Sequence, residues 1–288
     1  MSAWHNISLD VDDGVALLTV RRPQVLNALS WGTMAEIAQA ARQALADASV
    51  QGLILTSEGG ALAGADIKEL ATVDTAQAGE EMCQRGYQVL EVLEHSAKPV
   101  VAAVNGPVLG GGCEISMACH ARVVGPKLLL GQPEVNLGII PGYGGTQRLP
   151  RWIGVEHAND LLRSGRPVKA AEACAWGWAQ GEPVDDVVAG ARRLIRRHLS
   201  GEVVLHAVDA APLEVPASLP ELNIGYHSRA IDAILVQVMR EGWGCTLAQG
   251  LQIEARGFGR CIETEDMKIG MKNFIENGPR AQAVFVHG

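Results

Sequence analysis

The stretch that most constrains the fold lies between Pro99 and Arg148, where short apolar segments alternate with glycine-rich turns. Its first segment, Val100–Val104, is short and apolar and contains three valines, as expected of a buried strand. The strand ends at Asn105-Gly106-Pro107, a turn signal. Gly110-Gly111-Gly112 follows, and the apolar residues after it predict a helix packed inside the protein. This order of strand, turn and helix is typical of a mainly parallel α/β protein.

The three consecutive glycines allow the backbone to approach a bound molecule closely. A helix that begins there offers unpaired N–H groups and the positive end of its dipole. Both features favour an oxygen that becomes negative during a reaction. The glycines do not form the dinucleotide-binding pattern G-x-G-x-x-G. Tyr143-Gly144-Gly145 is not followed by the Lys-Ser/Thr of a phosphate-binding loop.

Two acidic residues in this stretch have apolar neighbours. Glu114 follows the glycines, and Glu134 follows Pro133, which fixes the backbone before it. A carboxylic acid in such surroundings is either functional or specifically paired. Each acid also has a structural interpretation when considered alone. Glu114 could cap amides at a helix N-terminus, and Glu134 could be a surface acid of a loop.

Four segments occur in a fixed order: RRPQVLNAL at 21–29, AGADIKEL at 63–70, NGPVLGGGCE at 105–114 and GQPEVNLGIIPGYGGTQRL at 131–149. Together they resemble the crotonase superfamily, that is, the enoyl-CoA hydratase/isomerase family, over roughly residues 5–195. Four ordered motifs are far more specific than any single glycine cluster. The resemblance implies an α/β fold, a crotonase-type spiral of ββα turns with a C-terminal helical region.

The resemblance also implies roles for individual residues. Glu114 would act as the base toward water and Glu134 as the acid toward the α-carbon of the substrate, the two acting together. The backbone N–H groups of Ala65 and Gly111 would form an oxyanion hole. Further contacts to the substrate or its coenzyme A moiety are implied at Leu26, Ala28, Ala63, Asp66, Ile67, Lys68 and Gly142.

Structural alternatives stay open for some of these contact residues. Leu26 and Ala28 could pack in the core, and Lys68 could be an exposed lysine on a helix. Asp66 could cap the helix that follows it.

The implied reaction is hydration of a 2-enoyl-CoA thioester to a 3-hydroxyacyl-CoA, or the reverse dehydration. Such a lyase needs no cofactor, because coenzyme A is part of the substrate. An enoyl-CoA isomerase or another crotonase-type reaction, such as hydrolysis or retro-aldol cleavage, is an alternative, although isomerases often use a single acid. A more remote alternative is that the protein is a non-catalytic, RNA-binding relative. The resemblance further implies a homotrimer, or a homohexamer built as a dimer of trimers.

Composition narrows the class of protein. The chain has 288 residues, of which 48% are hydrophobic, enough for a sizeable core. With a net charge of −8, the chain as a whole does not have the excess of basic residues that is typical of a nucleic-acid-binding surface. The basic run at 192–197 is best explained as the solvated face of a helix. No segment is apolar enough to span a bilayer, no secretory signal begins the chain, and the cysteines lack metal-ligand spacing. We therefore predict a cytoplasmic protein that binds neither nucleic acid nor membrane nor metal.

Periodicity and capping residues predict most of the helices and strands. We expect strands at 4–10, 14–20, 52–56, 100–104 and 121–124, and helices at 31–46, 80–95, 156–165, 170–178, 186–200, 246–261 and 264–275. Residues 1–207 should form the spiral core with the active site. Residues 208–288 should form a connecting segment and a helical region that helps to assemble the trimer. The proline-containing stretch 208–225 and the tail at 277–288 exceed the short-chain hydratase pattern, which indicates a specialised substrate.

Overall fold

A computed structural model describes residues 4–288 of the chain. Contacts between Cα atoms divide the chain into two compact units, each assembled from three separate stretches. Unit 1 comprises Met1–Ala65, Gln88–Leu130 and Val168–Val208, and unit 2 comprises Asp66–Tyr87, Gly131–Pro167 and Asp209–Gly288. The division into 1–207 and 208–288 concerns function and assembly, and it stays a prediction.

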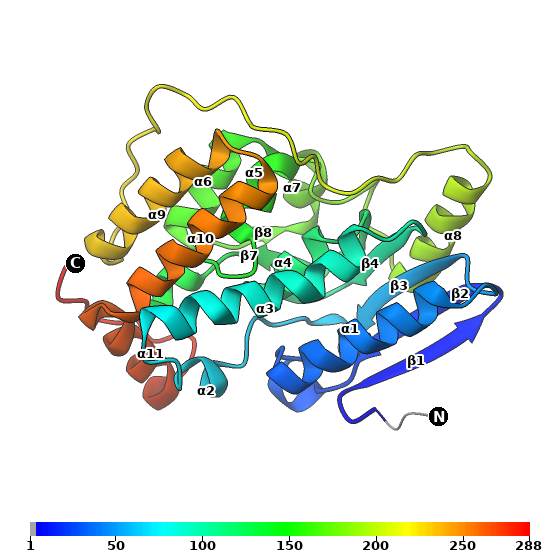
Figure 1. Cartoon of the computed structure of the whole chain (residues 1–288), viewed down its shortest axis with the longest axis horizontal. Helices are drawn as coiled ribbons and strands as arrows, with labels where there is room; N and C mark the ends of the chain where they lie inside the picture. Colours follow the sequence, from blue (N-terminus) through cyan, green and yellow to red (C-terminus); the bar gives the residue numbers. More distant parts are fainter. Residues whose placement is uncertain (1–3) are drawn as a thin grey trace. The chain divides into compact units, whose positions relative to one another are not determined.

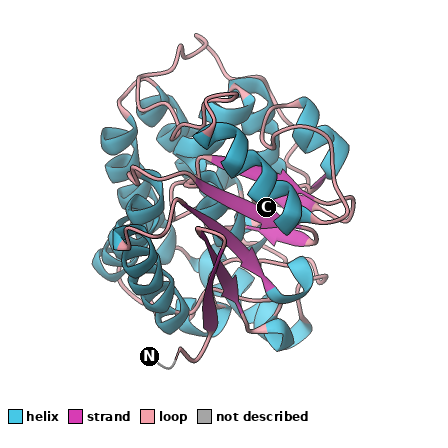
Figure 2. Ribbon diagram, turned by 90° about the vertical axis from the view of Figure 1, so that its right-hand side faces the viewer, coloured by secondary structure: helices cyan, strands magenta, loops and turns pink. Residues whose placement is uncertain are grey.

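Unit 1 contains a five-stranded sheet, whose strands are magenta in Figure 2. The strand order is β1 (Ile7–Asp12), β2 (Val15–Val20), β3 (Gly52–Ser57), β4 (Val100–Val104) and β6 (Ala121–Val124). Only β1 is antiparallel to its neighbour, and β2, β3, β4 and β6 run parallel. Strands β3, β4 and β6 are buried along their whole length, which explains why they are apolar without alternation.

The bounds of β1 and β2, which form a hairpin, differ from the predicted bounds 4–10 and 14–20. The strands begin at Ile7 and Val15, three residues and one residue later than expected. Only Asp13 and Gly14 form the turn, and both have a positive φ, 49° and 72°. A two-residue Asp-Gly turn of this kind leaves Asp12 in the strand, where it pairs with Val15.

Two helices pack on this sheet. Helix α1 (Trp31–Ala46) has the predicted bounds, begins at the N-cap Ser30 and runs beside β1 and β2 in Figure 1. Helix α8 (Val187–Leu199) packs on β3, β4 and β6. Its Ala191 and Ile195 lie in one buried cluster with Ile54 and Val101. The sheet and these helices form the core of unit 1.

Unit 1 also includes short elements near the glycine run. Strands β5 (Pro107–Leu109), β7 (Leu129–Gly131) and β8 (Val168–Lys169) form a second sheet, in that order, and Gly131 of β7 belongs to unit 2. They are too short to show a period, and the sequence did not predict them. Helices α4 (Gly111–Met117) and α7 (Ala170–Ala175) complete the unit. Helix α7 ends before the predicted residue 178 because Gly177 adopts a positive φ of 84°.

Unit 2 is helical. Its elements are α2 (Ile67–Leu70), the short 3₁₀ helix η3 (Glu134–Leu137), α5 (Gly145–Ile153), α6 (Val155–Ser164), α9 (Arg229–Trp243), α10 (Leu247–Ile262) and α11 (Glu265–Asn277). Helix α3 (Ala76–Glu94) begins in this unit, four residues before its predicted start. Ser228, Thr246 and Thr264 cap the last three helices, each through its side-chain oxygen.

Residues 209–227, which we call the strap, contain no helix or strand, as predicted for this connecting segment (yellow in Figure 1). The strap is nevertheless held by hydrogen bonds within unit 2. The N–H of Leu213 donates to the Trp243 carbonyl at 2.8 Å, and the N–H of Leu247 donates to the Ala210 carbonyl at 2.9 Å. Arg163 on α6 donates to the Pro220 carbonyl at 3.1 Å. The strap is therefore anchored to three helices.

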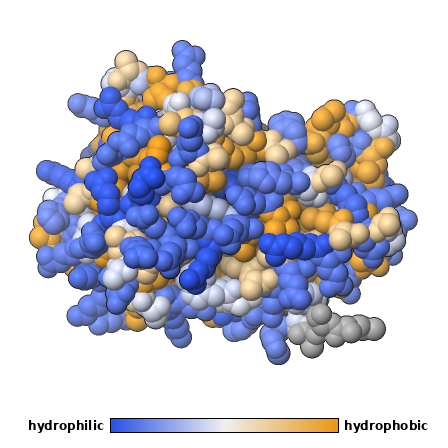
Figure 3. Space-filling model, viewed as in Figure 1, coloured by the Kyte–Doolittle hydropathy of each residue, from blue (hydrophilic) through white to orange (hydrophobic). Residues whose placement is uncertain are grey.

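Polar side chains cover most of the face shown in Figure 3, and hydrophobic groups are scattered among them. From residue 4 to residue 288, no helix combines the length and the apolar composition that crossing a membrane requires.

Candidate active site

In unit 1 the two segments predicted to form the oxyanion hole lie in backbone contact. Leu62 and Val108 form a parallel bridge, and the N–H of Leu109 donates to the Leu62 carbonyl at 3.2 Å. A Cβ atom on Gly64 would lie 3.1 Å from the nitrogen of Gly111. The segment with Ala65 and the segment with Gly111 are thus brought together, although their role in binding an oxyanion stays a prediction.

Two of the three glycines are required for this contact. Gly110 has a φ of 51° and ψ of −123°, a conformation that favours glycine. A Cβ atom on Gly112 would lie 1.9 Å from the carbonyl oxygen of Leu62, so a side chain there would push the two segments apart. The glycine run therefore serves close backbone approach, as its sequence indicated.

A strained turn at residues 22–28 supports the same segments. Leu26 and Asn27 both have a positive φ, 52° and 57°. The buried Asn27 amide donates to the carbonyls of Glu58 and Ala61, each at 2.8 Å, and its oxygen accepts from the N–H of Arg22 at 2.7 Å. These three bonds hold the turn in its conformation. Sequence analysis missed Asn27; the signal was an asparagine, which tolerates the left-handed region, within the first motif.

The turn also presents two of the predicted contact residues. The carbonyl of Leu26 accepts from the N–H of Ala63 at 2.9 Å. The side chain of Leu26 is 55% exposed, so the alternative that it packs in the core is wrong. Ala28 is half-buried, which leaves both of its interpretations open. The exposure of Leu26 is compatible with contact to a bound molecule.

Glu114 lies in the first turn of α4 and is 2% exposed. Its neighbours Cys113 and Ile115 are fully buried. Its N–H donates to the Gly110 carbonyl at 2.9 Å, as the fourth residue of a regular helix should. A place in the first turn fits a carboxylate that caps the helix as well as a catalytic one, so both interpretations stay open. The burial of Glu114 confirms that it is an acid inside the protein.

Glu134 begins η3 in unit 2 and is 8% exposed, so the alternative of a surface acid is wrong. With the Gln132 amide assigned so that its nitrogen faces Glu134, this nitrogen donates to both carboxylate oxygens at 3.0 and 3.1 Å. Burial raises the pKa of Glu134 well above its ordinary value, and the negative charge of Glu254 raises it further. A carboxyl group with a raised pKa keeps its proton near neutral pH and can act as an acid.

The last two residues of the strap bind Asn136 in η3. Asn136 accepts hydrogen bonds from the Tyr226 hydroxyl at 2.5 Å and from Nε2 of His227 at 2.9 Å, and it donates to the Pro133 carbonyl at 3.0 Å. Because the acceptor is the Asn136 oxygen, Nε2 carries the proton of His227. Helix α11 holds the other end, since a Cβ atom on Gly270 would lie 2.3 Å from the Leu137 carbonyl oxygen. Sequence analysis predicted none of these supporting contacts.

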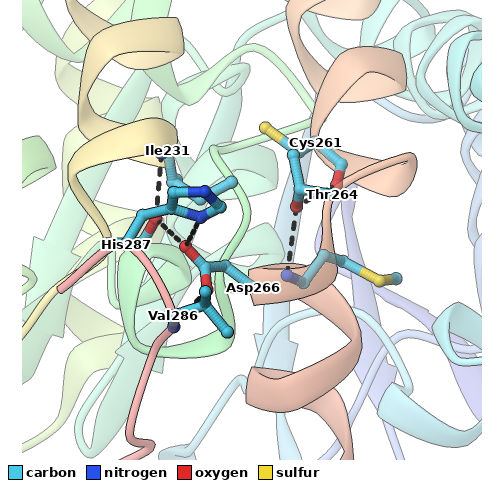
Figure 4. A network of polar contacts seen from close by, with 8 residues as sticks. Ile231, Cys261, Thr264, Asp266, Val286 and His287 are labelled. Atoms are coloured by element: carbon cyan, nitrogen blue, oxygen red, sulfur yellow. Dashed lines mark hydrogen bonds and ion pairs between the residues drawn. The ribbon is translucent and has the colours of Figure 1, made fainter.

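Asp266, at the start of α11, joins Ser228, the residue that follows the strap, to the C-terminal tail (Figure 4). Its buried carboxylate accepts hydrogen bonds from the Ser228 hydroxyl at 2.5 Å, the N–H of Val286 at 2.8 Å and Nδ1 of His287 at 3.0 Å. Burial alone would raise the pKa of Asp266, but these hydrogen bonds outweigh it and lower the pKa below its ordinary value. The tail beyond the predicted family pattern is therefore fixed to the helix that also contacts η3.

The remaining predicted contact residues lie in unit 2. Asp66 caps α2 by accepting from the N–H of Lys68 at 3.2 Å, so its structural alternative is confirmed. Lys68 is exposed and Ile67 half-buried. Gly142 is buried against α10, where a Cβ atom would lie 3.0 Å from the Phe258 ring. Within residues 4–288, no group of three or more His, Cys, Asp and Glu side chains could hold a metal ion.

Glu254, which is fully buried on α10, was not among the predicted site residues. A signal was present, because Leu247, Leu251, Glu254 and Phe258 recur at helical spacing. That spacing puts the acid on the apolar face of its helix, where a carboxyl group requires partners.

Known proteins resemble this chain over nearly its whole length. A family profile described as enoyl-CoA hydratase/isomerase matches residues 10–213. A probable enoyl-CoA hydratase of Bacillus subtilis is 35% identical, over 94% of this chain and 95% of its own. A short-chain-enoyl-CoA hydratase of Clostridium acetobutylicum is 36% identical, over 94% of this chain and 95% of its own.

A solved structure supports the same relationship. The crystal structure of an enoyl-CoA hydratase from Bacillus anthracis superposes with a TM-score of 0.63 at 29% identity, and the match covers 99% of this chain and 100% of the other. The predicted crotonase-type α/β fold is confirmed. The chain belongs to the enoyl-CoA hydratase/isomerase family of the crotonase superfamily.

Proposed function

We propose that this protein hydrates a 2-enoyl-CoA thioester to a 3-hydroxyacyl-CoA, and that it catalyses the reverse dehydration at the same site. The observation that most supports hydration is Glu134, a buried carboxyl group in the family motif whose raised pKa keeps it protonated. Two relatives named as hydratases, at 35% and 36% identity, support the same reaction. The reaction needs no cofactor, because the substrate contains coenzyme A.

The thioester oxygen would be bound by the N–H groups of Ala65 and Gly111. Both belong to the two segments held together through Leu62 and Val108. As the α-carbon gains electron density, negative charge builds on this oxygen. Two fixed N–H donors stabilise that charge, and removal of one such donor typically raises a barrier by about 3 kcal/mol.

The two buried acids would divide the proton transfers. Glu114, ionised, takes a proton from the water that attacks the β-carbon, and Glu134, protonated, gives its proton to the α-carbon. Each carboxyl group then has the protonation state that the reverse reaction requires. The role of Glu134 agrees with its raised pKa.

The substrate or its coenzyme A moiety would contact Leu26, Ala28, Ala63, Asp66, Ile67, Lys68 and Gly142, as the family motifs imply. Asp66 can cap α2 through its side chain and still contact a ligand through its backbone. We further propose a cytoplasmic homotrimer or homohexamer. The strap and the tail, which exceed the short-chain pattern, indicate an acyl group other than a simple short chain.

The test is product analysis with the purified full-length protein, crotonyl-CoA and a panel of longer, branched and cyclic enoyl-CoA thioesters. In water enriched in heavy oxygen, hydration places the label on the β-carbon, whereas an isomerase moves the double bond without incorporating label. Glu134→Gln should abolish hydration and leave binding of a CoA thioester intact. The exposed Glu276, changed to Gln, is the matched control and should retain wild-type turnover. Turnover by Glu134→Gln would contradict the proposed mechanism.

A further inference from the structure

The carboxyl group of Glu254 is fully buried in unit 2 and has no part in the chemistry proposed above. It accepts four hydrogen bonds. The N–H of Gly144 donates at 2.6 Å, and the N–H and hydroxyl of Thr146 donate at 2.9 and 2.5 Å. The hydroxyl of Tyr87 lies at 3.0 Å and shares its proton with the Leu251 carbonyl, which is also at 3.0 Å. A carboxylate that accepts this many hydrogen bonds fixes the groups that donate them.

The group that Glu254 fixes is the glycine-rich segment at residues 142–146. One turn further along α10, Phe258 packs against Gly142, where an added Cβ atom would lie 3.0 Å from the ring. The Tyr143 ring lies against Gly86 of α3, where an added Cβ atom would lie 2.2 Å from it. Helix α10 therefore holds the segment at two points, and α3 holds it at a third.

Helix capping alone does not account for this arrangement. An N-terminus is usually capped by Ser, Thr, Asp or Asn at the N-cap position itself, but α5 has Gly144 there, with a φ of 99°. The carboxylate comes instead from a residue 110 positions away in the sequence. No capping side chain fits at position 144, because the φ of Gly144 is 99° and an added Cβ atom would lie 1.8 Å from Nη1 of Arg148. The conformation of the segment itself therefore requires an acceptor from elsewhere in the fold.

We propose that Glu254 is a positioning residue: through Gly144 and Thr146 it fixes the glycine-rich segment so that the backbone at Gly142 is correctly placed against the bound thioester. This inference rests on the proposed function, in which Gly142 contacts the substrate. The segment contributes backbone rather than side chains to this contact, so its geometry has to be imposed by neighbours. Burial raises the pKa of Glu254 itself to about 7, so its carboxyl group is mainly ionised above that pH. Once ionised, Glu254 has a second effect in the same direction, because its charge raises the pKa of the proton donor Glu134.

The experiment compares Glu254→Gln with two other variants of the full-length protein. Glutamine has the same size but presents one amide group, so a nitrogen donor would face an N–H of Gly144 or Thr146. We expect kcat to fall about 10- to 100-fold while KM changes less than about 3-fold, because misplacement near the reacting atoms affects the transition state most. Tyr87→Phe removes only one of the four hydrogen bonds and should lower kcat less.

Asp232→Asn is the matched control. It is also a change from acid to amide on a C-terminal helix of unit 2, and it weakens the ion pair with Arg163, whose N···O distances are 2.7 and 2.9 Å. It should lower the melting temperature and leave kcat within about 2-fold of wild type, since Asp232 lies outside the segment.

The outcomes separate the two proposals. A wild-type protein that hydrates no thioester of the panel overturns the proposed function and the role of Glu254 with it. An active wild-type protein whose Glu254→Gln variant loses no more kcat than Asp232→Asn overturns the positioning role alone. If Glu254→Gln does not fold, Tyr87→Phe decides: a selective loss of kcat supports the inference, and an unchanged kcat overturns it.

Discussion

Gly112 and Leu62 are in such close backbone contact that only a hydrogen atom fits on the Cα of Gly112 facing the Leu62 carbonyl. The contact joins the glycine run after β5 to the segment that leads to Ala65. It thereby sets the separation of the two N–H groups proposed to bind the thioester oxygen.

Gly112→Ala should therefore impair catalysis. The added methyl group would displace one segment from the other, and we expect kcat/KM to fall about 100-fold with about 1–3 kcal/mol lost from the free energy of unfolding. Steady-state kinetics and urea denaturation measure both effects. Gly32→Ala on α1 is the control, because its nearest contact is at 3.7 Å, and it should be neutral or stabilising by up to about 1 kcal/mol. Equal kinetics for the two variants would contradict the prediction.

Asn27→Ala should destabilise the protein. It removes a donor from the carbonyls of Glu58 and Ala61 and an acceptor from the N–H of Arg22, while alanine tolerates the positive φ of 57° less well. We expect a loss of about 2–4 kcal/mol in the free energy of unfolding. The exposed Asn277 is a suitable comparison, since its change to alanine should cost less than about 0.5 kcal/mol. A loss below about 1 kcal/mol for Asn27→Ala would show that the turn keeps its conformation without the hydrogen bonds of Asn27.

The rate of hydration should fall in alkaline solution. Glu134 must be protonated to act as an acid, so kcat is full below its pKa and declines as pH rises through it. Since burial and the charge of Glu254 raise this pKa, the decline should lie well above the ordinary glutamate value of about 4.3. In Glu254→Gln the negative neighbour is gone, and the decline should move to lower pH. A pH–rate profile with the same midpoint in both proteins would exclude an electrostatic effect of Glu254.

Asp266→Asn should loosen the tail and its connection to Ser228, the N-cap of α9. An amide can accept hydrogen bonds through only one of its two polar atoms, so at least one of the bonds from Ser228, Val286 and His287 is lost. We expect about 1.5–3 kcal/mol of destabilisation and faster hydrogen exchange at residues 284–288. Because the pKa of Asp266 is lowered, its contribution to stability should be present above the unfolded-state pKa and lost as pH falls through the folded-state value. Exposed Asp47, changed to Asn, should leave exchange of the tail unchanged.

Local signals explain which parts of the fold could be predicted. The bounds of α1 were correct because Ser30 and the spacing of Met34, Ile37, Ala38 and Ala41 act within a few residues. The family, and with it the fold, followed from four motifs. Strands of two or three residues, such as β8 and β5, have no period, and their existence depends on pairing with distant segments.

The candidate site shows the same limit. Burial of Glu134 excludes a surface loop, but the sequence alone left that possibility open because a segment with Gly131, Pro133 and Gly138 is also typical of a loop. Glu254 binds Gly144 and Tyr87, which lie 110 and 167 positions away, and Asn136 binds Tyr226, which lies 90 positions away, so both sets of contacts are beyond any local pattern. The catalytic and contact roles stay predictions.

The assembly of each unit from three separate stretches has a consequence for how the gene can change. No single cut of the coding sequence separates unit 1 from unit 2, so neither can be transferred to another protein by one recombination event. Chimaeras of two relatives with one crossover would mix parental sequences inside a unit. Active hybrids should instead be recovered when all three stretches of a unit are exchanged together.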